Sequence, residues 1–208
     1  MNKVVAVIKI RSESNTNLYD VFSELVTTCE KIVINDENNL LSKKDAQMLF
    51  ELFDVDIYKS EFYDLSMYSP DWILTLYDDE RPDKSFRFMK DSYCYNKYVK
   101  IWEADFLPLW DSEEKYRSDK LWGQQKYPFL FKWIPEIDYQ YKDGCLVPHN
   151  QPGPQEYCSG PMLSYRYLDR DERIDIYKNY LKEKDNLNYI TQLHYESLLD
   201  KNPVLKSW

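Results

Sequence analysis

The sequence contains little glycine and little histidine, and each shortage excludes kinds of functional site. Of its 208 residues, 4 are glycine and 2 are histidine. Backbone loops that cradle phosphate need closely spaced glycines, and the chain has no G-x-x-x-x-G-K-[ST], G-x-G-x-x-G or G-x-S-x-G motif. This absence argues against kinases, nucleotide-dependent enzymes, Rossmann dehydrogenases and α/β-hydrolases.

Basic charge is also in deficit, and long apolar runs are missing. Lys and Arg total 27 against 36 Asp and Glu, which gives a formal net charge of −9 and a pI of about 4.9. A general nucleic-acid binder needs a positive surface, so direct nucleic-acid binding is not expected. No apolar run approaches the roughly 20 residues that cross a bilayer. Lys9 and Arg11 end the first apolar stretch too early for a signal peptide. The 4 cysteines include no C-x-x-C pair, so we expect a cytoplasmic protein with free thiols and no membrane contact.

Aromatic residues are plentiful, with 19 Tyr, 9 Phe and 6 Trp. AT-rich codons explain part of the tyrosine excess. Tyr and Trp are also the side chains that most often anchor protein interfaces. Many of these rings lie between residues 93 and 141. They fit either a core that lacks small residues or a partner-binding surface.

The hydrophobic pattern predicts one α+β domain over residues 1–208, with a minor lobe boundary near 66–70. Helical spacing and capping signals predict helices at 17–31, 42–53, 112–120, 169–181 and 186–200. Apolar or alternating runs predict strands at 3–10, 32–34, 72–77, 85–89, 98–106, 129–134, 137–141, 145–147 and 163–168. We expect a central, mostly antiparallel sheet in which 85–89 pairs back on 72–77, with helices from the N-terminal third and a C-terminal helix pair.

Cysteine and histidine offer two candidate sites. Cys145, His149 and Cys158, completed by Cys94 or His194, have donor atoms that zinc prefers, but the spacing lacks a second close pair. The thiol of Cys158 or Cys145 could act as a nucleophile if His149 or His194 lies beside it as a base. We expect no metal and no cofactor, and keep His149 and Cys158 as the catalytic candidates.

Carboxylates cluster at three places, 54–56, 78–80 and 169–172. Such groups hold Mg²⁺ or Ca²⁺, or act as acid and base. The second cluster also fits a polar turn, and the third fits a helix start, where acids favour the macrodipole. Composition alone therefore does not assign them a catalytic role.

In general character the chain resembles the small, acidic, motif-poor inhibitors of microbial conflict, such as immunity proteins and phage anti-defence proteins. The resemblance lies in composition and covers no alignable motif. It implies a non-enzymatic protein that inhibits a basic protein partner, such as a nuclease or nucleic-acid-binding protein, by occlusion. The expected contacts are exposed acids and aromatics. They are Asp78, Asp79, Glu80, Trp102, Glu103, Trp110, Glu113, Glu114 and Trp122.

Two alternatives remain open. One is a hydrolase with a carboxylate or Cys/His site near the Pro-rich loop 148–161. The other is a structural or assembly protein of a phage or mobile element, which is expected to form a defined oligomer. The sequence does not fix the oligomeric state.

Overall fold

The computed structural model describes residues 2–11, 18–59, 64–122, 125–135, 137, 139–142, 145–148 and 153–208. The chain divides into two compact units. Unit 1 comprises Met1–Ala104 and Tyr127–Gly160, and unit 2 comprises Asp105–Lys126 and Pro161–Trp208. The fold is mixed α+β, as the sequence indicates in outline.

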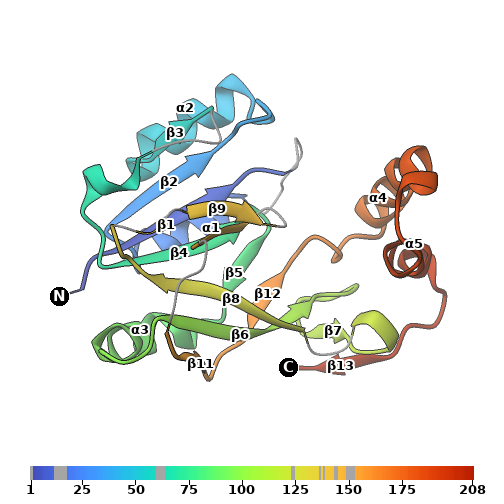
Figure 1. The fold of residues 1–208 in the computed structure, drawn as a ribbon. Coiled ribbons are helices and arrows are strands. Elements are labelled where there is room, and N and C mark those ends of the chain that lie inside the picture. Colours follow the sequence, from blue (N-terminus) through green and yellow to red (C-terminus); the bar gives the residue numbers. More distant parts are fainter. Residues whose placement is uncertain are drawn as a thin grey trace. The chain divides into compact units, whose positions relative to one another are not determined.

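Unit 1 begins with alternating strands and helices. They are β1 (Val4–Lys9), α1 (Leu18–Leu25), β2 (Lys31–Asn35), α2 (Lys43–Phe53) and β3 (Asp56–Tyr58), followed by the short helix η1 (Leu65–Tyr68) and β4 (Trp72–Tyr77). β1 pairs in parallel with β2 on one side and with β4 on the other, and β3 pairs in parallel with β2. The strand order is therefore β3-β2-β1-β4 (Figure 1).

The parallel pairing corrects the expected mostly antiparallel sheet, which is in fact mixed. Beyond β4, β8 (Gln125–Lys132) pairs antiparallel to it, and β6 (Ile101–Pro108) lies next in the order. The runs VVAVIK and WILTLY are buried along almost their whole length. Strands covered on both faces read as continuous apolar runs, which is typical of parallel sheets.

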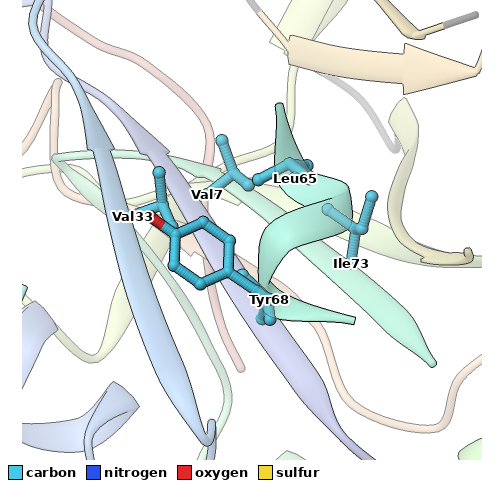
Figure 2. Packing of buried hydrophobic residues seen from close by; sticks show 6 residues of the cluster. Val7, Val33, Leu65, Tyr68 and Ile73 are labelled. Atoms are coloured by element: carbon cyan, nitrogen blue, oxygen red, sulfur yellow. The ribbon is translucent and has the colours of Figure 1, made fainter. Parts of the chain in front are cut away.

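Both faces of this sheet are covered. Val5, Val7, Val33 and Ile73 share one face, where they pack against Leu65 and Tyr68 from η1. Figure 2 shows η1 lying over these strands. Alternate residues of the same strands point to the other face. The helices α1 and α2 supply further buried side chains, namely Leu18, Val21, Phe22, Leu25 and Leu49.

The helix α2 begins where its capping sequence predicts. The Oγ atom of Ser42 accepts a hydrogen bond from the backbone N–H of Asp45 at 3.0 Å. Its hydroxyl also donates to the Asp45 carboxylate at 2.6 Å. The helix ends at Asp54, which adopts a left-handed conformation with φ of 48°.

Residues 85–89, expected to form a hairpin strand, lie instead in the helix α3 (Ser85–Tyr95). The alternation of SFRFM is short, and the residues beyond it carry a helical period. Phe86, Lys90, Tyr93 and Cys94 are buried on one side of α3. Before the helix, β5 (Glu80–Pro82) occupies the stretch expected to be a turn.

The remainder of unit 1 consists of strands. β9 (Tyr139–Lys142) and β10 (Cys145–Pro148) form an antiparallel hairpin, as the Asp143-Gly144 signal predicts, although those two residues lie outside the described chain. β11 (Gln155–Tyr157) pairs in parallel with Ile101–Glu103 of β6. Gly153 has a φ of +146°, and a Cβ placed there would lie 2.3 Å from Cγ of Lys100, so this position favours glycine.

Unit 2 combines short strands with the expected C-terminal helix pair. Residues 106–108 of β6 pair in parallel with β12 (Met162–Ser164). The helices are α4 (Arg170–Glu183) and α5 (Tyr189–Glu196), with the short helices η2 (Lys120–Trp122), η3 (Lys184–Asn186) and η4 (Ser197–Leu199). Asp169 caps α4 by accepting hydrogen bonds from the backbone N–H groups of Asp171 and Glu172.

The helix expected at 112–120 is not formed. Its central part is instead β7 (Lys115–Arg117), which pairs antiparallel with β13 (Leu205–Ser207). The two strands are about 90 residues apart in sequence, so no local pattern announces the pairing. The core of unit 2 is aromatic. Trp110, Trp122 and Leu198 pack together with partly buried tyrosines.

Candidate active site at the carboxyl edge of the parallel strands

The carboxyl ends of β1 and β4 meet at a change in the direction of strand order. From β1 the chain proceeds through β2 to β3 on one side, and then returns to β4 on the other side of β1. In open α/β sheets, ligands bind outside the carboxyl ends of the strands at such a switch point. Arg11 lies two residues beyond the end of β1, and Asp78 directly follows β4.

Arg11 joins the two strand ends through its guanidinium group. Its Nε donates to Oδ2 of Asp79 at 3.2 Å, and its Nη2 donates to Oδ1 of the same carboxylate. Nη2 also lies 3.5 Å from Oε1 of Glu80. The guanidinium carbon is 3.7 Å from the centroid of the Tyr77 ring. One cation is therefore shared between two carboxylates and backed by an aromatic ring.

Backbone groups also form hydrogen bonds with the acidic turn at residues 78–80. The N–H of Tyr77 donates to Oε2 of Glu80 at 3.1 Å, and the N–H of Asp78 donates to the carbonyl of Lys9 at 3.1 Å. The N–H of Arg11 lies 3.4 Å from Oδ1 of Asp78. Asp78 and Glu80 are 0% and 1% exposed. Burying carboxylates costs stability, so this turn differs from an ordinary solvated loop.

Glu80 titrates in the neutral range. Its pKa is raised from 4.5 to about 7, chiefly by burial, with a contribution from the negative charges of Asp79 and Asp78. The Arg11 guanidinium and the N–H of Tyr77 oppose it. A carboxyl group with a pKa near the operating pH accepts and returns protons readily, and perturbed groups of this kind concentrate at functional sites.

The end of β2 supplies a third polar segment at the same edge. Asp36 is buried and its Oδ1 accepts the N–H of Leu40 at 2.7 Å, which fixes the loop after β2. Lys9 and Glu37 form an ion pair at 2.5 Å. Asn35 is fully buried, and its side-chain oxygen accepts the N–H of Glu37 at 3.1 Å. These contacts give the edge a defined shape.

The expected contact residues do not form one exposed surface. Asp78, Asp79, Glu80 and Trp102 lie in unit 1, and all four are buried. Glu103, also in unit 1, is half-buried. The expectation of exposure is therefore wrong for these acids, because the chain uses them to build a turn beneath Arg11.

The remaining contact residues lie in unit 2. Trp110 and Trp122 are core residues, 1% and 4% exposed, with ring centroids 5.2 Å apart, so they too were wrongly expected at the surface. Glu113 and Glu114 are exposed. For these tryptophans, the aromatic excess is explained by large rings that fill a core with few small residues, and not by a partner-binding surface.

The cysteine and histidine candidates are not brought together in the part of the chain that is described. His149 and the side chain of Cys145 lie outside the described residues. Cys158 is partly exposed, with Sγ 2.9 Å from the carbonyl of Gly160. Burial raises the pKa of Cys94 to about 12, which keeps this thiol protonated. Over the described ranges, no group of three or more His, Cys, Asp or Glu residues is arranged to hold a metal ion.

His194 belongs to the aromatic core of unit 2. Its ring stacks on Trp122 with centroids 4.3 Å apart. Its pKa is lowered to about 4, mainly by burial and in addition by the nearby charges of Arg166 and Arg117. The imidazole is therefore neutral at physiological pH and serves here as a packed aromatic group.

Arg11 is the residue of this site that sequence reasoning missed. Its signal was its place, directly after a buried apolar run, just as Asp78 directly follows WILTLY. If both runs are taken as neighbouring parallel strands, the two ends meet at one edge. The expected antiparallel hairpin hid this relation.

Known proteins resemble this chain in structure but do not match it in sequence. No protein family matches the sequence, and no curated protein matches it either. Among solved structures, S. aureus TarS is similar with a TM-score of 0.45 and 8% identity, covering 96% of this chain and 42% of TarS. A fragment, TarS 1–349, gives a TM-score of 0.40 and 9% identity, covering 96% of this chain and 69% of the fragment. The chain thus spans less than half of the full TarS structure, and similarity at this level carries no argument about function. None of the described helices is long and apolar enough to cross a bilayer.

Proposed function

We propose that the protein is an enzyme that binds a nucleotide-containing small molecule at the carboxyl edge of β1 and β4. The observation that carries this proposal is Glu80, which is buried at the switch point beside the Arg11 guanidinium that Asp79 also binds, and which has a pKa of about 7. A buried acid–arginine cluster is a costly way to build a turn. Buried titratable groups with shifted pKa values are, by contrast, common at functional sites.

The choice of a nucleotide follows from topology. The segment from β1 to β3 is a βαβαβ unit with strand order β3-β2-β1, the arrangement of a mononucleotide-binding half. This support is an analogy of fold. The lack of closely spaced glycines excludes a glycine cradle for phosphate, so Arg11 and any cation held by Asp79 and Glu80 would have to offset the phosphate charge.

The chemistry proposed for Glu80 is proton transfer. Its carboxylate form accepts a proton from an attacking hydroxyl group or water, and its protonated form returns one to the leaving group. Arg11 and Tyr77 act as positioning residues, because they hold the Glu80 side chain and set its charge state. The reaction class is transfer of a group to a hydroxyl acceptor.

Ligand-induced stabilisation tests this function. Thermal unfolding is measured with nucleoside mono-, di- and triphosphates, each with Mg²⁺ or with EDTA. A ligand at 100 times its Kd adds about 2.7 kcal/mol, which raises Tm by roughly 5–10 °C for a chain of this size. The shift should be lost in Asp79→Asn and kept in Glu114→Gln, a matched change at an exposed acid. If no nucleotide shifts the Tm of the unaltered protein, the proposal fails.

A second candidate is the occluding inhibitor, for which one observation remains. Glu113 and Glu114 are exposed in unit 2, and Nε1 of Trp208 donates to the carbonyl of Glu113 at 2.7 Å. Trp208 is 48% exposed. An exposed tryptophan beside two acids is the composition expected of a surface that meets a basic partner.

Charge reversal tests the inhibitor. Glu113→Lys combined with Glu114→Lys should slow association with a basic partner captured from host lysate about 10-fold at low salt. It should also flatten the dependence of the rate on salt. Glu183→Lys, an exposed change on α4, is the matched control and should leave the rate unchanged. An unaltered rate in the double variant removes this surface from consideration.

A further inference from the structure

Positive charge is concentrated in one short part of this acidic protein. Residues 84–100 contain five basic residues and one acid, a net of +4, within a chain of net charge −9. The segment covers α3 and the turn after it, all in unit 1. Of these charged residues, Lys84, Arg87, Lys97 and Asp91 are exposed, so the exposed side of the segment carries a net charge of +2, opposite in sign to the whole chain.

The inner face of α3 fixes the helix firmly on unit 1. Phe86 packs edge-on against Phe129 with centroids 5.5 Å apart, and Tyr93 packs against Trp102 at 4.6 Å. The buried Nζ of Lys90 donates to the carbonyl of Thr28 at 2.5 Å. These contacts of the buried side fix the orientation of α3, and they leave the side chains of its outward side exposed.

Exposed aromatic and basic side chains share that outward face. Phe88 is 80% exposed and Tyr95 is 68% exposed. They are seven residues apart, so they lie along one stripe of the helix, and Lys84 precedes Phe88 by one turn. Lys84 and Arg87 are also exposed.

The turn after α3 continues this surface. The side-chain oxygen of Asn96 accepts the N–H of Tyr98 at 3.0 Å, which fixes the turn. Tyr98 is 84% exposed, and Lys97 is exposed beside it. The backbone N–H of Lys132 donates to the carbonyl of Lys100 at 2.9 Å, which places Lys132 beside this turn. Burial lowers the pKa of Lys132, the charges of Lys100 and Lys97 lower it as well, and Asp71 opposes them.

Exposure of apolar groups alone does not single out α3. The helix α2 also exposes Phe50 and Leu52, at 62% and 57%. Its segment 43–54, however, contains two basic and three acidic residues, a net of −1. Among the helices that the structure describes, α3 is the one that combines exposed rings with an excess of positive charge.

We propose that Lys84, Arg87, Phe88, Tyr95, Lys97 and Tyr98, here called the α3 patch, bind the headgroup surface of an anionic membrane. Phe88 enters the boundary between headgroups and acyl chains, and the tyrosines lie at headgroup level. The three basic side chains contact lipid phosphates. A lipid surface suits the patch better than another polyanion, because the phenyl group of Phe88 has no polar atom and gains most from an apolar surrounding.

This inference stands apart from the proposed nucleotide site. It agrees with the absence of a membrane-spanning helix among the described residues and departs from the expectation of no membrane contact, which rested on the lack of a spanning apolar run. A helix that lies on the membrane surface needs no such run.

Co-sedimentation with vesicles tests the α3 patch. The full chain is mixed with vesicles of phosphatidylcholine alone, or with 30 mol% phosphatidylglycerol added. Binding is expected to the anionic vesicles only and to be lost in 0.5 M salt. Each basic side chain contributes roughly fivefold to partitioning. Lys84→Glu, Arg87→Glu and Lys97→Glu together should therefore reduce it more than 100-fold, and Phe88→Ala about 10-fold.

Matched changes on α2 serve as controls. Lys43→Glu with Lys44→Glu, and Phe50→Ala, should leave vesicle binding unchanged. All of these side chains are exposed, so folding is preserved and is verified by circular dichroism. Equal binding to neutral vesicles, or equal loss in the α2 controls, overturns the proposal. Binding to a single-stranded oligonucleotide without binding to anionic vesicles also overturns it and assigns the patch to nucleic acid.

Discussion

Replacing Arg11 with methionine is expected to lower the free energy of unfolding by about 3 kcal/mol at pH 8 and by clearly less at pH 5.5. Arg11 is the cation bound to Asp79 and Glu80, and both carboxylates are largely buried. Methionine fills a similar volume but leaves these two charges without their shared partner. Urea unfolding at the two pH values measures the difference.

The pH dependence follows from Glu80. Its pKa is about 7 in the folded protein against 4.5 for an ordinary glutamate. The folded state thus holds its proton more tightly than the unfolded state. The resulting stability is fully present below about pH 4.5 and is lost as the pH rises through 7. Without Arg11 the pKa of Glu80 rises further. The variant therefore loses more unfolding free energy at pH 8, where ionisation of Glu80 is favoured in the unfolded state, than at pH 5.5.

Two further variants separate the causes. Arg11→Met combined with Glu80→Gln should recover the part of the loss that depends on pH, because the buried charge at position 80 is gone while Asp79 still lacks its partner. Arg87→Met, at an exposed arginine of unit 1, should change stability by less than about 0.5 kcal/mol. Equal losses at pH 5.5 and pH 8 in Arg11→Met would mean that Glu80 is not the titrating partner.

Replacing Arg117 with methionine is expected to cost about 3–5 kcal/mol of unfolding free energy. Arg117 is fully buried in unit 2. Its Nε donates to Asp119 at 2.7 Å, its Nη2 to Asp200 at 2.5 Å, and its Nη1 to the carbonyl of Ser197 at 2.5 Å. The guanidinium also lies 4.8 Å from the ring centroid of Trp110. Methionine replaces none of these hydrogen bonds.

Chemical unfolding monitored by tryptophan fluorescence checks this expectation. The unfolding free energy of Arg117→Lys should fall between those of the unaltered protein and Arg117→Met. Lysine keeps the charge but lacks the planar guanidinium group that reaches several acceptors at once. Arg170→Met on α4 removes an exposed arginine and should have little effect. A loss below 1 kcal/mol in Arg117→Met would show that the aromatic rings hold unit 2 together without this cation.

Local signals were sufficient where an element depends on its own residues. The run of β1, the cap of α2 at Ser42, and the C-terminal helix pair after Asp169 were all predicted. In each case, a hydrophobic period or a capping side chain lies within a few residues of the element it defines.

Local sequence patterns failed to predict the secondary structure where it depends on contacts between distant segments. β7 forms because β13 pairs with it, and 112–120 contains no trace of that partner. Residues 85–89 alternate like a strand, but α3 forms because Phe86, Tyr93 and Cys94 bury one helical side against the sheet. Tertiary packing outweighs a short local pattern of this kind.

The same division holds for the candidate site. The sequence alone marked the acids at 78–80 as one of three carboxylate clusters and as expected partner contacts, argued against glycine-based phosphate loops and showed the excess of aromatic rings. Only the tertiary structure placed Arg11 on these acids, buried Glu80 and buried all three tryptophans that were expected at the surface. The reason is that a carboxylate's pKa and exposure depend on what surrounds it, and its surroundings come from strands about 70 residues apart in the chain.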